Sequence, residues 1–415
     1  MLLLPIAHSQ NASMYPDLSY IFHDLIGTQP DNWLSIFKTF GFVLALAFLA
    51  SAFFYFIELK RKAEAGIFTF STLKIVDGAP ASWGEIASSG LAGMILGGKV
   101  LYGFLHAAEF KSDPAAIILS SKMNWPGAIV GLLLTGGFTW WDAHRRRKTE
   151  PTEREVKVWP HHLISEMTVW AAVGGILGAK IFDMLDNWET TMHDPWGALA
   201  SGGGLAIFGG LFGGAITVIS YILYKKIPLL HAMDACAPAL VMGYAVGRVG
   251  CQLSGDGDWG LPNLAPKPGW MGFLPDWMWS FNYPRNVLGP HYFDEISGNQ
   301  NVKMAGENTF QYCYQLAQPV WPTPFYETLL ALVVFGILWK VRKKIAAPGV
   351  LFMLYMFLIG LERILVEQIR VNVVHHWFGL DMTQAELISA ILMAAGLVGG
   401  LTLWKKHRES QHESA

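Results

Sequence analysis

The sequence predicts an all-α polytopic membrane protein of about nine transmembrane helices, with a small extracytoplasmic head. Residues of the AVILMFWYC set make up 52% of the 415 residues and charged residues only 15%, against about 25% in soluble domains. The mean hydropathy is +0.33. Residues 40–57 carry no charge and are long enough to cross a hydrocarbon core of about 30 Å. The 43 glycines and 17 tryptophans suit close helix contacts and interfacial anchoring.

The apolar segments, taken in order, predict nine spans. They lie at 38–58, 87–108, 126–143, 161–184, 203–224, 233–250, 323–341, 349–370 and 384–404. The longest remaining segment is rich in Gly, Pro and aromatic residues, so we expect it to be ordered. The predicted organisation is an extracytoplasmic segment (1–36), six membrane helices (37–250), an extracytoplasmic head (251–321), three membrane helices (322–404) and a cytoplasmic tail (405–415).

The distribution of Lys and Arg predicts the orientation in the membrane. Segments that follow the odd-numbered spans hold 19 of these residues, and the opposite side holds five. Because positive charge stays on the cytoplasmic side, the N-terminus is expected outside and the C-terminus inside. The first residues, MLLLPIAHSQ, lack a basic region, so a cleaved signal peptide is not expected.

Charge and cysteine content exclude other classes of protein. The net charge is -2, and there is no basic excess that would favour a nucleic-acid partner. Cys236, Cys251 and Cys313 show neither metal-ligand spacing nor an even-numbered disulfide framework. We therefore expect no metal site.

An internal repeat is visible in the first half of the chain. GMILGGK (93–99) matches GGILGAK (174–180) at an offset of 81, and Asp-Pro recurs at the same offset at 113–114 and 194–195. The pattern predicts a duplicated hairpin, with 87–143 as the additional copy. The alternative is that Gly-rich membrane helices resemble one another by composition.

Two arginines in predicted spans are the first candidates for chemistry. A charge inside a bilayer costs at least about 2.5 kcal/mol, so it needs a partner or a function. Arg248 lies in YAVGRVGCQLSGDGDWG (244–260), and Arg363 lies in GLERILVEQIR (360–370). An arginine stays ionised and binds phosphate in a bidentate manner. The alternative for Arg248 is a structural ion pair with Asp234 or snorkelling to the interface.

Other polar residues keep two interpretations at this stage. Tyr326 and Glu327 in WPTPFYE either line a polar cavity or belong to an ordinary helix start. Asp256 and Asp258 are either bases at the membrane surface or turn-forming residues in a Gly-rich loop. The small residues of GGGLAIFGGLFGG (202–214) either permit close helix packing or leave room for a lipid.

Several of these motifs together resemble one protein family. They are GGLAIFGG (203–210), MDACAPAL (233–240), GRVGCQLSGDGDWG, PTPFYE, ERILVEQIR and MTQAELIS (382–389). In this order they resemble the prolipoprotein diacylglyceryl transferase family, over roughly 161–404. The resemblance implies a multi-pass enzyme of the bacterial cytoplasmic (inner) membrane. Such an enzyme moves the sn-1,2-diacylglyceryl group of phosphatidylglycerol onto the lipobox cysteine thiol of a prolipoprotein, in the first step of lipoprotein maturation. Glycerol 1-phosphate is released, and no cofactor is implied.

The resemblance also assigns site residues. Arg248 and Arg363 match essential arginines, and Asp256 matches the acid of the family's loop. The expected substrate-binding residues are Gly247, Gly250, Gly255, Gly260, Tyr326, Glu327, Glu367, Arg370, Asp234 and Lys180. Two guanidinium groups would neutralise charge on the phosphate as the glycerol–phosphate C–O bond breaks.

The chain departs from the family at several positions. Phe208 and Trp321 stand where members have histidines, and Cys251 replaces an asparagine of the signature. A histidine base for the thiol is therefore not expected here. Either the thiol ionises unaided, or Asp256, Asp258 or Glu367 accepts its proton, with Asp256 favoured. The departures also keep open a non-catalytic phospholipid-binding or transport protein of the same fold.

Overall fold

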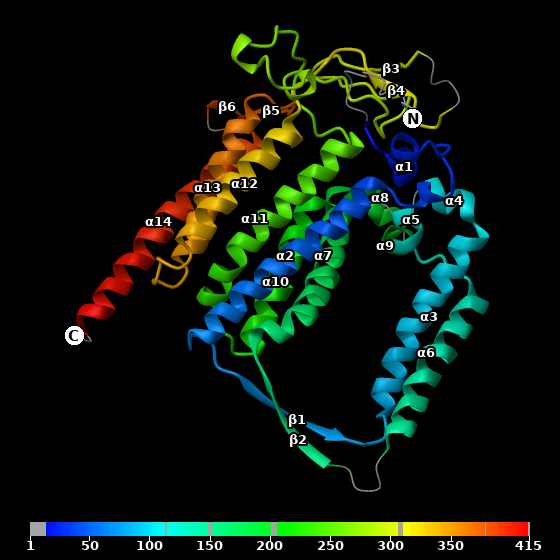
Figure 1. The fold of residues 1–415 in the computed structure, drawn as a ribbon, viewed down its shortest axis with the longest axis vertical. Helices are drawn as coiled ribbons and strands as arrows, with labels where there is room; N and C mark the ends of the chain where they lie inside the picture. The colour runs from blue at the N-terminus through cyan, green and yellow to red at the C-terminus, as the bar shows by residue number, and fades with distance from the viewer. Residues whose placement is uncertain are drawn as a thin grey trace, which may run out of the picture. The chain divides into compact units, whose positions relative to one another are not determined.

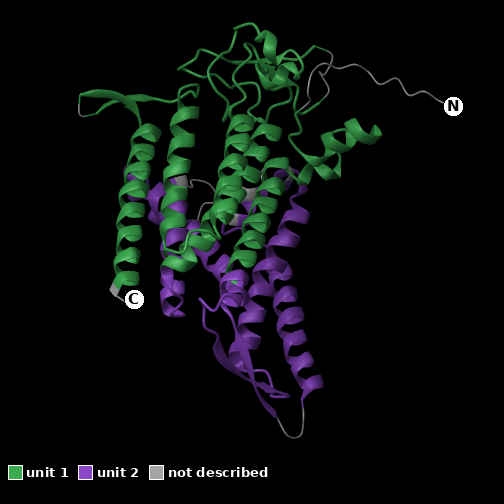
Figure 2. Cartoon of the chain, turned by 60° about the vertical axis from the view of Figure 1, so that its left-hand side comes forward, with its two compact units in different colours: residues 1–59, 230–415 green, residues 60–229 purple. Residues whose placement is uncertain are grey.

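The computed structural model describes residues 14–112, 114–147, 152–200, 206–305, 310–377 and 379–413. The chain divides into two compact units, residues 1–59 with 230–415 and residues 60–229, drawn in green and purple in Figure 2. Within the described residues the chain is mostly helical, and six helices are long and apolar enough to cross a membrane. The predicted class, a mostly helical polytopic membrane protein, is confirmed.

A long helix lies at each of the nine predicted spans (Figure 1). Six of them have the length and composition of a membrane span: α2 (Thr39–Glu64), α3 (Trp83–Leu105), α7 (Ile164–Asp186), α11 (Leu229–Ser254), α12 (Thr323–Val341) and α14 (Gln384–Glu413). The others are α6 (Trp125–Arg146), α10 (Ile207–Tyr224) and α13 (Val350–Glu367). Since α13 contains Glu362, Arg363 and Glu367, its composition alone does not mark it as a span. Nine crossings and their orientation stay predictions.

The membrane helices of the first unit pack through small residues. The Gly360 backbone of α13 lies against Met393 of α14, and Gly243 of α11 lies against Ser51 of α2. Buried aliphatic residues fill the contact between α11, α12 and α13: Val241, Ala245, Ala331, Val334, Leu338 and Leu351. This packing holds α11, α12 and α13 side by side, so their ends can contribute to one site.

Residues 255–321 form a head with its own core and little regular structure. The short strands β3 (Asn301–Lys303) and β4 (Tyr314–Leu316) pair antiparallel. The core consists of Met14, Trp259, Phe281, Tyr283, Leu316 and Val320. The N-terminal segment joins the head through α1 (Leu18–Ile26), where Asp24 accepts from Arg285 at 3.4 Å. The buried core explains why a segment of so many glycines and prolines is ordered.

The second unit consists of two copies of one motif. The order strand, long helix, two short helices, long helix occurs twice, and the first four elements of the second copy each start 81 residues after their counterparts in the first. The elements besides the long helices are β1 (Ser71–Asp77), α4 (Ala107–Ser112) and α5 (Pro114–Leu119), then β2 (Thr152–Val158), α8 (Trp188–His193) and α9 (Pro195–Ala200). Asp113 of the repeated Asp-Pro pair lies outside the described residues.

The two long helices of each hairpin are joined by equivalent contacts in the two copies. Thr135 Oγ1 donates to the Ser89 carbonyl at 2.8 Å in the first hairpin, and Thr217 Oγ1 donates to the Trp170 carbonyl at 2.9 Å in the second. A Cβ atom on Gly131 would collide with the Gly93 backbone, and one on Gly213 with Gly174. Similarity by composition would not reproduce these contacts pair by pair, so they support a duplication.

Two features differ from the sequence expectation. The all-α prediction missed three two-stranded ribbons, of which the third joins β5 (Val374–Trp377) to β6 (Leu380–Thr383). Strands β1 and β2 pair antiparallel in a register that places Lys74 opposite Glu155. Helix α14 continues to Glu413, through most of the predicted tail, because charged residues do not end a helix where no Gly or Pro follows.

Candidate active site

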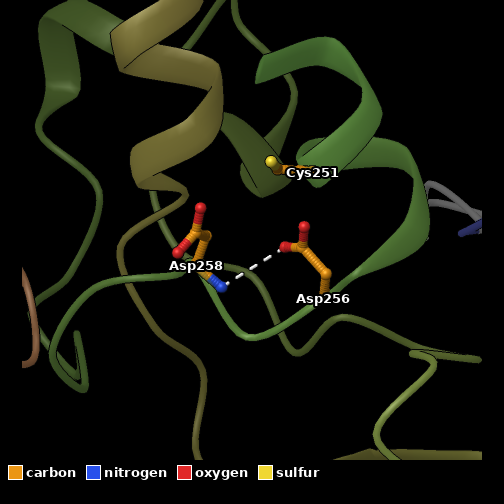
Figure 3. A group of neighbouring side chains, drawn as sticks. All are labelled: Cys251, Asp256 and Asp258. Carbon is orange, nitrogen blue, oxygen red and sulfur yellow. Dashed lines mark hydrogen bonds between the residues drawn. The ribbon is translucent and has the colours of Figure 1, made fainter. Parts of the chain in front are cut away.

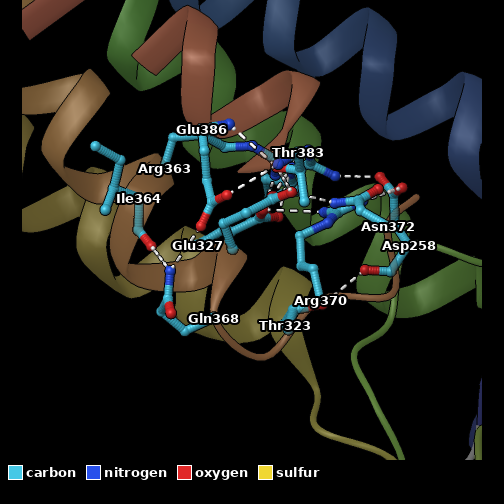
Figure 4. Close-up of polar contacts among 12 residues, drawn as sticks. Asp258, Thr323, Glu327, Arg363, Ile364, Gln368, Arg370, Asn372, Thr383 and Glu386 are labelled. Atoms are coloured by element: carbon cyan, nitrogen blue, oxygen red, sulfur yellow. Dashed lines mark hydrogen bonds and ion pairs between the residues drawn. The ribbon is translucent and has the colours of Figure 1, made fainter. Parts of the chain in front are cut away.

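Glu327 is the centre of a buried ion-pair cluster. The carboxylate lies in the second turn of α12 and is 0% exposed. It accepts from Arg363 Nη1 and Arg370 Nη1, both at 3.1 Å, and pairs with Arg248 Nε at 2.8 Å. Figure 4 shows Arg363 and Arg370 beside Glu327. Three arginines from α11, α13 and the segment after α13 thus converge on one carboxylate from α12.

Two further carboxylates complete the cluster. Glu367 pairs with Arg363 at 3.1 Å and accepts from Asn372 Nδ2 and Thr383 Oγ1, both at 2.6 Å. Asp258 uses both oxygens, Oδ2 with Arg248 Nη1 and Oδ1 with Arg370 Nη2 at 2.9 Å. The three guanidinium groups are therefore matched by three ion-paired carboxylates. This arrangement satisfies charges that would otherwise be costly at membrane depth.

Gly260 connects the Gly-rich loop to the arginine segment. Its position pairs with Arg370 in an isolated β-bridge, and the next amide, Leu261 N–H, donates to the Ile369 carbonyl at 2.8 Å. A Cβ atom on Gly260 would collide with that carbonyl and lie 2.9 Å from Thr323 Cγ2. Only glycine fits this approach. The closing glycine of the sequence motif therefore holds Arg370 in the cluster.

Asp256 lies beside the cluster but outside its ion pairs. Its Oδ1 accepts from the Asp258 amide at 3.4 Å, as Figure 3 shows. Burial, followed by the charge of Asp258, raises the pKa of Asp256. Burial acts in the same direction on Asp258, but Arg248 and Arg370 outweigh it and lower the pKa of Asp258 below its usual range. Adjacent carboxyls with pKa values pushed apart are typical of acid–base sites.

Cys251, Asp256 and Asp258 form the group of described residues that comes closest to a metal site. Their potential ligand atoms lie within 4.8 Å of one another (Figure 3). However, Asp258 already uses both oxygens for guanidinium groups, and these fixed positive charges would oppose a bound cation. We assign no metal here.

Several predicted residues lie elsewhere or have other contacts. The Tyr326 hydroxyl donates to the Met278 carbonyl in the head at 2.7 Å, so it joins α12 to the head. Asp234 accepts from the amides of Gly349 at 2.9 Å and Phe352 at 3.0 Å, and thereby caps α13. It lies 14 residues before Arg248 on α11, about 21 Å along the helix at 1.5 Å per residue.

The predicted glycines and Lys180 also differ in their surroundings. Gly250 lies against Val43 of α2, and a Cβ atom on Gly247 would meet no atom within 4 Å. Gly255 has a φ of +63° at the start of the loop. Lys180 lies in α7, in the other unit, where it is buried.

The cluster contains residues that the sequence analysis did not single out. Thr323 Oγ1 donates to the Asp258 carbonyl at 2.7 Å and fixes the backbone of the loop. Thr383 supports Glu367 and also caps α14, because Glu386 N–H donates to its Oγ1 at 3.1 Å. The T-x-x-E spacing of Thr383 and Glu386 is a capping-box signal in the sequence. It could have identified this threonine as a fixed point beside the arginine helix.

The fold and the cluster define a helical membrane protein with an arginine–carboxylate centre where three membrane helices meet a Gly-rich loop. A sequence model of the prolipoprotein diacylglyceryl transferase family matches residues 128–402, which is more than half of the chain. The chain belongs to this family. It is a membrane transferase of lipoprotein biosynthesis.

Curated relatives agree with the family match. A phosphatidylglycerol–prolipoprotein diacylglyceryl transferase of Dehalococcoides mccartyi is 25% identical over 305 residues, covering 73% of this chain and 98% of the relative. The enzyme of the same name from Leptospira interrogans is 26% identical over 315 residues, covering 64% and 85%. That of Corynebacterium efficiens is 28% identical over 248 residues, covering 59% and 69%.

Proposed function

We propose that the chain transfers the sn-1,2-diacylglyceryl group of phosphatidylglycerol to the lipobox cysteine thiol of prolipoproteins and releases glycerol 1-phosphate. The convergence of Arg248, Arg363 and Arg370 is the observation that carries this proposal. Their side chains remain 16%, 24% and 10% exposed, so a phosphate can reach them. The names of the curated relatives supply the substrates.

The chemistry follows from the charges. The thiolate attacks the glycerol carbon that bears the phosphate, a C–S bond forms, and the C–O bond breaks with its electron pair on the phosphate. The leaving group gains a negative charge, which preorganised guanidinium groups stabilise without reorganisation. In this proposal Arg248 and Arg363 hold the phosphate, Glu327 and Glu367 orient the arginines, and a carboxylate of the loop after α11, Asp256 or Asp258, accepts the thiol proton.

The location and topology belong to the same proposal. The chain would cross the cytoplasmic (inner) membrane nine times, with the N-terminus and residues 251–321 outside and residues 405–415 inside. The lipobox of the prolipoprotein would then meet the arginines at the outer surface of the bilayer. The excess of Lys and Arg on the predicted inner side supports this orientation.

The test uses purified protein in detergent micelles that contain phosphatidylglycerol, together with a lipobox peptide. Mass spectrometry follows the peptide, and a coupled assay follows glycerol phosphate. We expect a diacylglyceryl mass on the cysteine and an equal amount of glycerol phosphate. A preparation that binds the lipid yet leaves it intact would contradict the transferase.

That contradictory outcome would favour a non-catalytic phospholipid-binding protein. The observation behind this second candidate is Trp321, at a position where the resemblance leads one to expect a histidine. Its ring contacts Trp279 at a centroid distance of 4.5 Å and fills the place with aromatic packing. Arg248 and Arg363 alone would still permit binding of an anionic lipid.

A further inference from the structure

Asp258 occupies the position that a phosphate needs. One carboxylate oxygen pairs with Arg248 Nη1 and the other accepts from Arg370 Nη2 at 2.9 Å. Arginine recognises carboxylate and phosphate oxygens with the same fork geometry. Two non-bridging oxygens of a phosphodiester would therefore use the same two donors that Asp258 uses.

The charge balance of the cluster requires an exchange. Arg248, Arg363 and Arg370 are matched by Glu327, Glu367 and Asp258. An anionic phosphodiester added to this set would leave an uncompensated negative charge in a poorly solvated place, which is costly. One carboxylate must leave the arginines or take up a proton when the lipid binds.

Burial decides which carboxylate can leave. Glu327 is 0% exposed and contacts three arginines, and the Glu367 side chain is 1% exposed and held by Thr383 and Asn372. The side chain of Asp258 is 37% exposed. Asp258 follows Gly255 and Gly257, which have φ values of +63° and +101°. Thr323 Oγ1 donates to the backbone carbonyl of Asp258 and fixes it. The Asp258 side chain can therefore turn away while its backbone stays in place.

We propose that Asp258 is a resident counter-ion that the phosphate of the lipid displaces from Arg248 and Arg370, and that the freed carboxylate accepts the proton of the incoming thiol. This inference rests on the proposed function and deepens it. Substrate binding and base activation become one event, because a carboxylate that holds two guanidinium groups is a weak base and a freed one is stronger.

The freed side chain has an acidic neighbour. Asp256, Asp258 and Cys251 offer ligand atoms within 4.8 Å of one another, so Asp256 is within reach of the Asp258 carboxylate when that carboxylate leaves the arginines. Two carboxylates in one site do not both stay ionised, and the pair takes up a proton more readily than either alone. The groups that face Asp258 are Arg248 and Cys251 on α11, Arg370 after α13, and Asp256 on its own loop. Glu327 on α12 shares both arginines.

The step balances in atoms and charge. The thiol proton moves to the freed carboxylate, sulfur bonds to the glycerol carbon, and the phosphate keeps the C–O electron pair. The lipid phosphate goes from one negative charge to two as Asp258 goes from one to none. When glycerol phosphate leaves, Asp258 returns to the arginines and releases its proton to water.

The decisive experiment compares lipid affinity in Asp258→Asn and Asp256→Asn. The probe is short-chain phosphatidylglycerol, with short-chain phosphatidylcholine as the zwitterionic control. Asp258→Asn leaves Arg248 and Arg370 each paired with Glu327 but removes the competing anion. We expect phosphatidylglycerol to bind at least about ten-fold more tightly and the rate constant for transfer to fall about 100-fold, so that KM and kcat fall together.

The matched control separates exchange from a general change of charge. Among the described residues Asp256 makes no ion pair with these arginines, so Asp256→Asn should not tighten binding. Unchanged or weaker phosphatidylglycerol binding by Asp258→Asn would overturn the proposal. So would equal tightening by both variants, because the effect would then be nonspecific.

A measurement on the unmodified protein decides the matter if Asp258→Asn does not fold. Titration of short-chain phosphatidylglycerol at pH 6 in two buffers of different ionisation enthalpy gives the number of protons bound with the lipid. We expect proton uptake that decreases toward pH 8; no uptake at pH 6 would overturn the proposal. These readouts are independent of transfer, so a protein that binds lipid without turnover fails the proposed function, and the exchange is still tested.

Discussion

At the scale of single residues, the ion pairs of Arg248 and Arg363 alone do not distinguish a phosphate-binding role from a structural one. Two features favour phosphate binding: the guanidinium groups are accessible, and three arginines contact one carboxylate. Glu327 contacts all three arginines, and Asp258 and Glu367 supply the other two negative charges. An incoming phosphate would therefore use guanidinium groups that a carboxylate occupies in the resting protein.

We expect Arg248→Ala and Arg363→Ala each to lower lipid transfer at least about 100-fold, because a fixed charge aimed at the leaving phosphate is lost. The assay is peptide lipidation by mass spectrometry. Arg154→Ala is the control, since this arginine is 66% exposed on β2. Transfer at the level of the unmodified protein by either site variant would remove the phosphate-binding role.

Asp256 gives a prediction about stability and pH. Burial and the charge of Asp258 raise its pKa in the folded protein, so ionisation opposes folding at pH values above the unfolded pKa of about 3.9. The penalty is complete above the folded pKa and disappears as pH falls. We expect Asp256→Asn to raise the unfolding temperature at pH 8 and to lose this advantage toward pH 4. A stabilisation that is equal at both pH values would contradict the assigned cause.

The sequence singled out Arg248 and Arg363 because charges in apolar segments stand out, and the family resemblance added Glu327 and Arg370. It placed Asp234 among the substrate-binding residues, whereas the structure shows its carboxylate capping α13. Sequence order cannot show that the cap and the cluster lie near opposite ends of α11. It also could not reveal that Asp258, rather than Asp256, pairs with the arginines, since the two acids lie two positions apart in one Gly-rich loop.

At the scale of elements, the loop after α11 and the segment after α13 are joined by backbone contacts at Gly260. The bridge to Arg370 and the contact with the Ile369 carbonyl leave no room for a side chain. A shift of the loop backbone at Gly260 would therefore also shift Arg370.

We expect Gly260→Ala to reduce transfer and to destabilise the protein by about 1–3 kcal/mol, because the added methyl group forces the two segments apart. Gly269→Ala in the head is the matched control, since a Cβ atom there meets nothing within 4 Å. Thermal unfolding and the lipidation assay are measured on both. If the two variants behave alike, the close approach at Gly260 has no mechanical role.

Helix positions followed from apolar length, but the ribbons did not. Strands β1 and β2 are largely exposed, so no buried apolar face marks them as paired. Paired residues lie 75 to 87 positions apart in the sequence, and only the duplication connects the two strands. Propensity within a short window cannot show such a pairing.

At the scale of the whole molecule, the topology is open to a direct test. We expect a cysteine introduced at Lys303 to react with a membrane-impermeant maleimide in intact cells. A cysteine introduced at Glu413 should react only after permeabilisation, because the N-out orientation places α14 with its C-terminus inside. Labelling of the unmodified protein gives the background from its native cysteines, two of which are buried. Labelling of both positions from the same side would exclude an odd number of spans between them, and so contradict the three predicted there.

The register of the β1–β2 ribbon points to the history of the second unit. Lys74 and Glu155 hold the same place in the two copies, and they face each other across the ribbon. In a two-fold symmetric pair of identical chains, the same strand of each chain can pair across the axis so that equivalent residues lie opposite each other. In such a pair this position would set a residue opposite an identical copy of itself, which for a charged residue means two like charges. Joined in one chain, the copies were free to diverge, and the position now carries lysine on one strand and glutamate on the other.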